Sequence, residues 1–320
     1  MKRFLVRIFI FISAIFLIDR TLFLLLKANR PPDYKKFLDA KKHFFEQDNK
    51  TQVLIVGDSH IADALDTRTI ERLTGLTSFN LGIYHSTPFE TYFIIKEALL
   101  KLETPPKYAI MGTNPEMLYG ENNMGVYSPL VIGNTLELVL QSKDKFSAKT
   151  FLKSLREKGL FSHLYAKLLG KKYTPTREVT DVHHGFLKFT NTSTLDSIRW
   201  NQTTLFDSIN VNRTQLDYFI KSVKLLQEKQ ITVLLVNPPL YYDTNNIKTA
   251  PFNSYLADNL KRKGIDLDLF TFPNKGHGTA YCCSKEYFLN STHLNYTGAK
   301  GFTEEFTRTL LNKELSSYEE

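Results

Sequence analysis

The chain has 320 residues, of which 42% are hydrophobic and 23% are charged. This composition excludes a wholly disordered protein and a membrane protein with many spans, and the length favours one large α/β domain or a domain with an insertion. The 41 basic and 33 acidic residues give a formal charge of +8, which first suggests a polyanionic partner such as nucleic acid.

Residues 1–27 are expected to form an uncleaved signal anchor, that is, a single transmembrane helix. The mainly apolar window Phe4–Leu26 is long enough to cross a bilayer, and no small-x-small cleavage site follows it. Lys2, Arg3 and Arg7 would hold the N-terminus in the cytoplasm. Everything after Lys27 is then predicted to lie on the extracytoplasmic side of the cytoplasmic membrane. A cleaved signal peptide and a buried helix are the alternatives.

Residues 28–50 are expected to be a juxtamembrane stalk, with a short polar-faced helix over Asp33–Gln47. A globular domain is predicted over residues 51–320, with an insertion at about 119–203, where the alternating pattern of strands and helices is lost. Within this insertion Ser147–Leu169 has helical spacing, whereas residues 171–204 are rich in Thr and Asn and have no clear period.

Short apolar runs alternate with helical patterns through the rest of the domain. The predicted strands are Val53–Val56, Thr77–Leu81, Tyr108–Met111, Ile231–Val236 and Ile265–Phe270. The predicted helices are Ile61–Leu73, Pro88–Leu102, Leu216–Lys229 and Gly298–Leu311. Alternation of this kind indicates an α/β fold, a three-layer sandwich with a central, mostly parallel sheet covered on both faces.

The sharpest motif is Gly57-Asp58-Ser59-His60, which lies directly after the first strand and directly before a helix. A serine there sits at the carboxyl edge of the sheet, where open α/β folds bind ligands. The helix N-terminus adds free backbone N–H groups that can stabilise an oxyanion. Gly-Asp-Ser is also common in turns, and by itself it predicts only that Asp58 or Ser59 caps the helix.

Three further residues are expected at the same carboxyl edge of the sheet. Gly82 follows the second strand, Asn114 follows the third, and His293 precedes the last helix. With Ser59, these residues resemble the four blocks of the SGNH (GDSL-type) hydrolase superfamily, whose fold is flavodoxin-like. The resemblance covers about residues 52–118 and 231–311. It implies that Ser59 is a nucleophile and His293 its base, and that the N–H groups of Ser59 and Gly82 and the Asn114 amide form an oxyanion hole.

The chain departs from the family pattern at Asn290, where the family usually has an aspartate three residues before the histidine. A neutral amide can hold the imidazole but stabilises its charged form less and can favour the wrong tautomer. Three outcomes are open: a Ser–His dyad oriented by Asn290, a carboxylate recruited from Asp266 or Asp268, or a weakened enzyme.

Other residues that could carry chemistry give weaker signals. His60 is expected to shape the pocket rather than act as base. The remaining candidate metal ligands, which show no ligand spacing and no carboxylate cluster, are His85, His183, His184 and His277. The adjacent Cys282 and Cys283 cannot provide a disulfide framework or a structural zinc site. No metal and no cofactor is therefore expected.

A single N-terminal anchor, a Gly-Asp-Ser-His start and a His-Leu-Asn end are most similar to the cell-envelope branch of the superfamily. That branch includes the alginate O-acetylation factors and the lipoteichoic-acid D-alanylation protein. The resemblance implies a serine esterase or O-acyltransferase that acts on an acylated envelope glycan or lipid, with a membrane acyltransferase as a potential partner. The alternative is a catalytically weakened module that binds an envelope polymer or such an acyltransferase.

The location of the positive charge changes its interpretation. Residues 1–27 hold five basic residues and one acidic residue, and residues 141–175 hold nine basic and two acidic residues. The remaining chain, with every candidate catalytic residue, is slightly acidic. Nucleic acid is therefore not expected as a partner, and the basic part of the insertion either rests on an anionic lipid or polymer or is a solvated surface.

Overall fold

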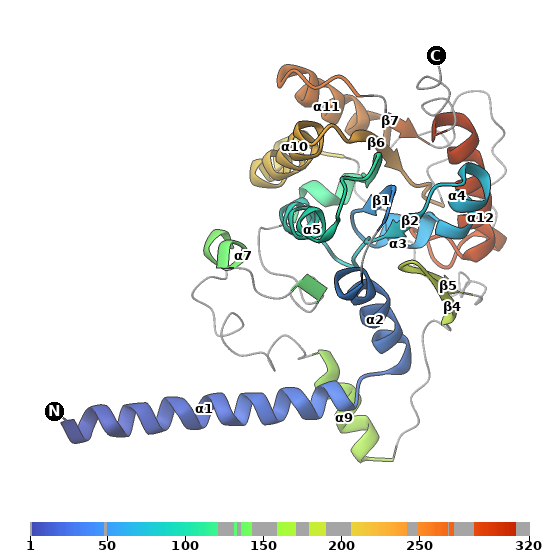
Figure 1. Cartoon of the computed structure of the whole chain (residues 1–320). Coiled ribbons are helices and arrows are strands. Elements are labelled where there is room, and N and C mark those ends of the chain that lie inside the picture. The colour runs from blue at the N-terminus through green and yellow to red at the C-terminus, as the bar shows by residue number, and fades with distance from the viewer. Residues whose placement is uncertain are drawn as a thin grey trace.

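The computed structural model describes residues 2–47, 50–120, 131–132, 136–142, 159–170, 179–189, 206–241, 249–267, 269–271 and 285–311. Five parallel strands form one sheet in the order β2-β1-β3-β6-β7, and β4 and β5 form a separate antiparallel hairpin (Figure 1). The strands are β1 Val53–Val56, β2 Ser78–Asn80, β3 Tyr108–Gly112, β4 Val179–His183, β5 Phe186–Phe189, β6 Thr232–Asn237 and β7 Leu269–Thr271. The predicted α/β class with a central parallel sheet is confirmed.

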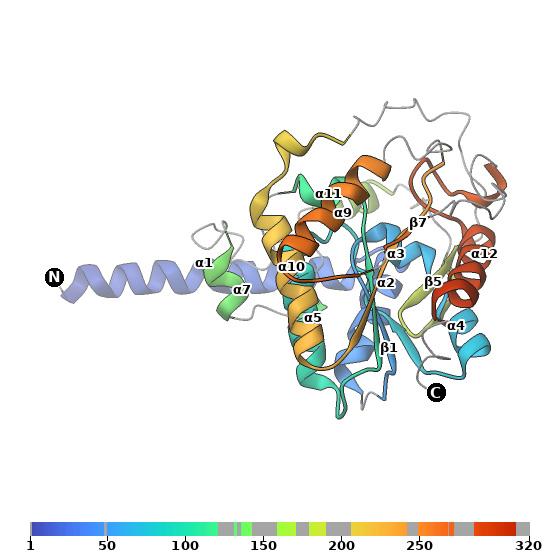
Figure 2. The same cartoon turned by 90° about the horizontal axis from the view of Figure 1, so that it is seen from above.

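Helices cover both faces of this sheet (Figure 2). One layer contains α5 (Pro88–Lys101), α10 (Arg213–Glu228) and α11 (Thr249–Arg262). The other contains α3 (Ser59–Ala64), α4 (Thr67–Thr74) and α12 (Tyr296–Phe306). The smaller described elements are η1 Pro115–Leu118, α7 Leu136–Gln141, α9 Gly159–Leu168, η3 Ser208–Asn210, η4 Lys285–Tyr287 and the π-turn Thr307–Leu311.

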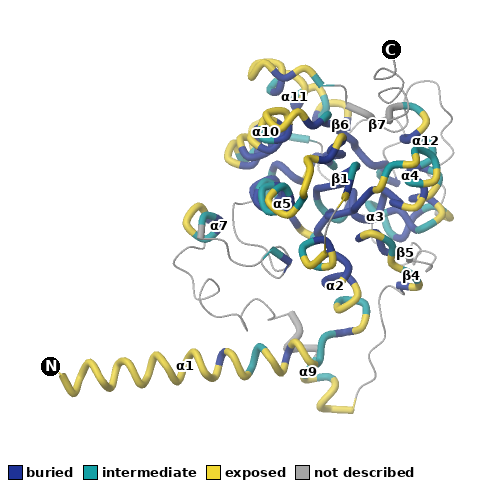
Figure 3. The backbone as a smooth tube through the Cα atoms, in the orientation of Figure 1, coloured by how far each residue is buried: buried dark blue, intermediate teal, exposed yellow. Residues whose placement is uncertain are grey.

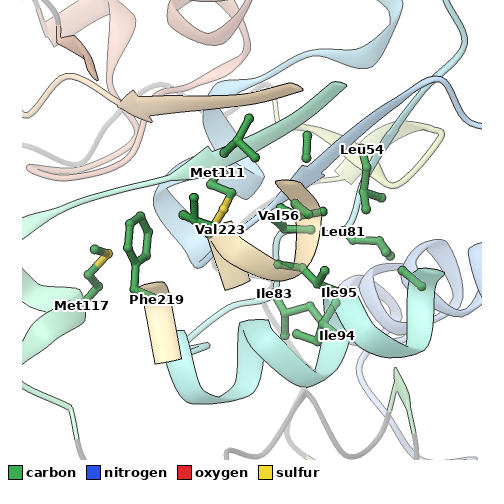
Figure 4. Close-up of a cluster of buried hydrophobic side chains, with 14 of the residues drawn as sticks. Leu54, Val56, Leu81, Ile83, Ile94, Ile95, Met111, Met117, Phe219 and Val223 are labelled. Carbon is green, nitrogen blue, oxygen red and sulfur yellow. The ribbon is translucent and has the colours of Figure 1, made fainter. Parts of the chain in front are cut away.

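The two faces of the sheet explain why its strands are apolar throughout. Leu54 and Val56 pack with α5 and α10 in one buried cluster, part of which Figure 4 shows. Val53 and Ile55 pack with α3, α4 and α12 in the other. Because successive side chains of a strand point to opposite faces, a strand between two helical layers needs apolar residues at every position.

The sequence-based elements differ from the structure at several points. The helix expected over Ile61–Leu73 is two helices, because Leu65 has an extended backbone and Asp66 caps α4 by accepting from the N–H of Arg68 (3.2 Å). The fifth strand is shorter than expected and begins at Leu269. Two elements were not predicted: α11, and the β4–β5 hairpin, which lies in the predicted insertion.

The N-terminal helix α1 (Lys2–Ala28) is long and apolar enough to cross a membrane, as predicted. It extends away from the α/β domain, and most of its side chains are exposed (Figures 1 and 3). The exposed fractions of Phe9 and Leu17 are 72% and 70%. By length and composition α1 can therefore cross a membrane, and a signal sequence would have the same properties.

The helix α2 (Pro32–Glu46) lies in the segment expected to be a stalk, and it packs against the domain instead. Phe37, Leu38 and Phe44 are buried in the same cluster as Leu54 and Val56. The polar pattern of α2 hid this role because the buried face includes Lys41, whose side chain is fully enclosed. The compact part of the chain thus includes α2 and begins before residue 51.

Candidate active site

The turn between β1 and α3 places Ser59 at the carboxyl edge of the sheet. Gly57 has φ +138°, a conformation that disfavours other residues, and a Cβ there would lie 2.8 Å from Cγ2 of Ile61. Asp58 then caps α3, since its Oδ1 accepts from the N–H of His60 (3.0 Å). The helix-cap interpretation of Asp58 is therefore right, and it leaves Ser59 as the first residue of the helix.

The structure brings Ser59 and His293 into direct contact. The Oγ atom of Ser59 lies 2.8 Å from Nε2 of His293. On the other side of the ring, Nδ1 lies 2.9 Å from Oδ1 of Asn290 and 2.9 Å from Oγ1 of Thr292. The residues at positions 59, 290 and 293 therefore form one hydrogen-bonded series, although 234 positions separate the serine from the histidine.

The surroundings of Asn290 fix the tautomer of His293. The Oδ1 atom of Asn290 accepts from the backbone N–H groups of Thr292 (2.9 Å) and His293 (3.0 Å). Rotating the amide would break both bonds, so an acceptor faces Nδ1 and the imidazole proton lies there. Nε2 is then free of a proton and can accept one from Ser59. The amide thus gives the tautomer that a general base needs, without supplying a negative charge.

One of the two aspartates expected as a substitute for the missing carboxylate, Asp266, lies in the part of the chain that the structure describes. Asp266 is exposed and lies just after α11, before β7 begins at Leu269. In a parallel sheet this is the amino edge, opposite to Ser59, so Asp266 cannot orient His293. Asp268 lies outside the described residues.

The side chains of Asp58 and His60 bind each other beside the turn that carries Ser59. Asp58 Oδ2 lies 3.0 Å from Nδ1 of His60 and accepts from Nδ2 of Asn114 (2.6 Å). Burial alone would raise the pKa of Asp58, but the charge and hydrogen bonds of His60 and the amide of Asn114 lower it. Burial would likewise lower the pKa of His60, but the Asp58 carboxylate raises it. The His60 ring stacks on His293 at a centroid distance of 4.9 Å, so His60 contacts the candidate base.

Two donors point to the region of the Ser59 hydroxyl. As the first residue of α3, Ser59 has a backbone N–H with no acceptor inside the helix. Asn114 is held by its Oδ1, which accepts from the N–H of Met117 (3.0 Å), so that its Nδ2 faces Asp58 beside the nucleophile. One Nδ2 proton binds Asp58, which precedes Ser59, and an amide nitrogen carries a second proton.

Gly82 does not fit the oxyanion role expected for it. Its N–H donates to Oδ1 of Asn80 (2.9 Å), and a Cβ at Gly82 would lie 2.8 Å from Cα of Ala62. The glycine therefore allows the turn after β2 to approach the backbone of α3. Because the Gly82 N–H already has an acceptor, it is not available to an oxyanion.

Thr292 was not expected at the site, and the bonds of Asp58 to His60 and Asn114 were not expected either. Thr292, Asp58 and His60 are direct neighbours of the proposed nucleophile or base, so proximity in the chain was a usable signal. Their hydrogen bonds depend on the turn conformations at both ends of the series, which residue types alone do not specify.

No protein-family model and no curated protein matches the sequence. Among solved structures, the chain is similar to one from Bacteroides fragilis NCTC 9343 described as a candidate acylhydrolase, with 12% identity, a TM-score of 0.40 and coverage of 88% of this chain and 96% of that one. Another, described as a candidate platelet activating factor from Streptococcus pneumonia, has 11% identity, a TM-score of 0.41 and coverage of 92% and 97%. Because both TM-scores lie below 0.5, the interpretation of the site rests on its geometry.

Proposed function

We propose that this chain is a membrane-anchored serine esterase or O-acyltransferase of the SGNH type, acting on acyl esters of a cell-envelope glycan or lipid. The observation that carries the proposal is the series from Ser59 Oγ to His293 Nε2 (2.8 Å) and from His293 Nδ1 to Asn290 Oδ1 (2.9 Å). A serine bonded to an unprotonated imidazole nitrogen at a helix N-terminus is suited to acyl transfer.

In the first half of the reaction, Ser59 Oγ attacks the carbonyl carbon of the ester, and its proton moves to His293 Nε2. The resulting oxyanion accepts hydrogen bonds from the Ser59 N–H and Asn114 Nδ2. The tetrahedral intermediate then collapses, the bond to the leaving alcohol breaks, and His293 returns the proton to that alcohol. The product is an acyl-enzyme on Ser59.

In the second half, water or a sugar hydroxyl gives its proton to His293 Nε2 and attacks the acyl carbon. The Ser59 ester bond breaks, and the serine recovers its proton from the imidazole. Water as acceptor makes the protein an esterase, and a hydroxyl of an envelope polymer makes it an O-acyltransferase. The apolar helix α1 supports a substrate at the membrane surface, where a membrane acyltransferase could supply acyl groups.

A second candidate function follows from the neutral side chain at Asn290. Without a carboxylate, the imidazolium formed during the reaction is stabilised less, and the reaction at Ser59 is slower than with an aspartate at this position. The domain could then act as a module that binds an acylated polymer or a partner enzyme. Reaction at Ser59 separates the two functions.

The deciding experiment is covalent labelling of the full chain by a fluorophosphonate probe. We expect labelling of the natural protein, none of Ser59→Ala, and a loss of about 10³-fold or more in labelling rate for His293→Ala. Hydrolysis of p-nitrophenyl acetate should follow the same order. Equal labelling of the natural chain and Ser59→Ala, or no labelling of either, would contradict the catalytic proposal and favour the binding module.

A further inference from the structure

We propose that Glu71, His183 and His184 form a Zn²⁺ site that fastens the β4–β5 hairpin to α4. Nε2 of His183 lies 2.7 Å from Oε2 of Glu71, and Nδ1 of His184 lies 2.7 Å from Oε1. One potential ligand atom from each side chain lies within 4.8 Å of the others. No other group of this kind occurs in the part of the chain that the structure describes.

The backbone around these side chains is held by contacts that a metal would leave intact. The carbonyl of His183 accepts from Oγ1 of Thr67 (2.8 Å), and the carbonyl of His184 accepts from the N–H of Asn80 (2.8 Å). On α4, Glu71 Oε1 accepts from the N–H of Ser78 (3.0 Å). The three ligands are therefore brought together by the fold, and their meeting does not depend on the hydrogen bonds between them.

The hairpin turn places an imidazole where a smaller side chain is usual. His183 pairs with Phe186, so His184 and Gly185 form a two-residue turn, with φ of +40° and +80°. Such turns favour Asn-Gly or Gly-Gly, because both central residues need positive φ. Here the first position carries a histidine that stacks on His183 at a centroid distance of 4.1 Å. Both rings thus face the Glu71 carboxylate.

The chemical nature of the three potential ligands favours one class of metal ion. Two imidazole nitrogens and one carboxylate suit Zn²⁺ and similar first-row divalent ions, whereas Mg²⁺ and Ca²⁺ prefer oxygen ligands. The side chains of His183, His184 and Glu71 are 28%, 43% and 22% exposed, which leaves access for an ion and for a water as fourth ligand. A hollow of about 170 Å³, lined in part by His184 and Ser78, lies beside the cluster.

The position of the cluster indicates a structural role. Glu71 contacts Ser78, the first residue of β2, and thus lies toward the amino edge of the sheet, whereas Ser59 lies at the carboxyl edge. Phe186 of the hairpin packs in the same cluster as Ile61 of α3. A metal at Glu71 would therefore fasten the hairpin to α4, and the hairpin in turn packs on α3, the helix that begins at Ser59.

The test is metal binding by the full chain in detergent micelles, prepared without a polyhistidine tag. Cobalt(II), a spectroscopic substitute for zinc, should give visible absorption that saturates at one ion per chain and is displaced by Zn²⁺. His184→Asn and Glu71→Gln should bind at least about tenfold more weakly, because even outer-shell changes typically cost about 10- to 100-fold in metal affinity. Zn²⁺ should raise the Tm of the natural chain but not of these variants.

His85→Asn is the matched control. Like His184, His85 is an exposed histidine with positive φ (59° against 40°), and asparagine tolerates that conformation at both sites. The control should bind metal as the natural chain does. Two results would overturn the proposal: less than a tenth of an ion per natural chain, or unchanged binding by both His184→Asn and Glu71→Gln. In either case Glu71 only bridges two histidines by hydrogen bonds.

Discussion

At position 290 the candidate site has a neutral amide in place of a carboxylate. Asn290 orients His293 through a neutral oxygen that is held by two backbone N–H groups. An aspartate could accept the same bonds, so the local conformation does not require an amide. The difference between the two side chains at this position is therefore mainly one of charge on the acceptor.

We expect Asn290→Asp to increase the rate of Ser59 acylation. The carboxylate would keep the bond to Nδ1 and would stabilise the imidazolium that forms in the transition state, so a gain of about tenfold or more is expected. The measurement is the rate of fluorophosphonate labelling and of p-nitrophenyl acetate hydrolysis. Asn290→Ala is the control and should be slower than the natural chain. An unchanged rate in Asn290→Asp would mean that charge at this position does not limit the chemistry.

Asp58 and His293 show how far residue types predict a site. The sequence indicated a nucleophile and a base because each lies next to a strand or helix boundary. It did not predict that Asp58 would bind Asn114, which lies 56 positions later. Nor did it predict Glu71 beside His183, at a separation of 112 positions, and for that reason no metal was expected. Such long-range pairs follow from packing, which local patterns do not encode.

At the scale of elements, close approaches to α3 position the nucleophile. A Cβ at Gly82 would lie 2.8 Å from Cα and 2.9 Å from N of Ala62, and one at Gly112 would lie 2.5 Å from Cβ of Ile61. The ends of β2 and β3 thus contact the short helix that begins at Ser59. Backbone atoms of α3 cannot turn away as a side-chain tip would, so any added volume there must move the helix.

Gly82→Ala should therefore destabilise the fold and slow labelling of Ser59 together. Overpacking of this kind typically costs about 1–3 kcal/mol. Adding Ala62→Gly should restore little, because the contacts with the backbone of residue 62 remain. Gly75→Asn is the control, since Gly75 has φ +71° and open space around it. Chemical unfolding measures the stability, and full rescue by Ala62→Gly would show that only the two side chains collide.

The helix α2 contributes an unusual buried amine. Lys41 Nζ donates to the carbonyls of Asn80 (2.8 Å) and Gly185 (2.7 Å), so it connects α2 to β2 and to the hairpin turn. Burial lowers the pKa of Lys41 from 10.5 to about 7, although the negative charge of Asp63 opposes this shift. The folded chain then releases the Lys41 proton several pH units before the unfolded chain does.

This difference in pKa predicts the sign of a pH effect. Above about pH 7 the unfolded chain binds more protons at Lys41 than the folded chain, so the contribution of Lys41 to stability rises with pH until about 10.5. The free energy of unfolding of the natural chain, minus that of Lys41→Met, should increase by about 1.4 kcal/mol per pH unit in this range. Unfolding at pH 7.5 and 9.5 measures it. A constant difference would mean that the folded chain keeps the amine charged.

At the scale of the whole molecule, the α/β architecture was predictable and its boundaries were not. Apolar runs such as Val53–Val56 predicted the buried parallel strands, because only apolar residues fit between two helical layers. The polar pattern of Pro32–Glu46 concealed a packed helix, since a buried lysine counts as a solvent-facing residue in any sequence pattern. The hairpin at Val179–Phe189 was missed because its side chains alternate over only a few residues.

Two truncations separate the anchor from the folded unit. A chain without residues 2–28 should leave the membrane fraction, remain folded and label at Ser59, because α1 is largely exposed. A chain without residues 2–47 should not fold, since it loses Phe37, Leu38 and Phe44 from the core. Each such side chain contributes about 1.5–3 kcal/mol, and a typical domain has only about 5–15 kcal/mol in total. Circular dichroism and fractionation measure both outcomes. A folded, labelled product of the longer truncation would restore the stalk interpretation.

The short connection between α1 and α2 limits how far the α/β domain can lie from the end of α1. Only Asn29, Arg30 and Pro31 separate the two helices, and three extended residues span about 10 Å. When α1 lies in a bilayer, this short connection and the packing of α2 in the core keep the domain close to the membrane surface. Under the proposed function, this geometry predicts substrates that lie at the membrane surface, such as lipid-linked or newly exported molecules, rather than the distal parts of an envelope polymer.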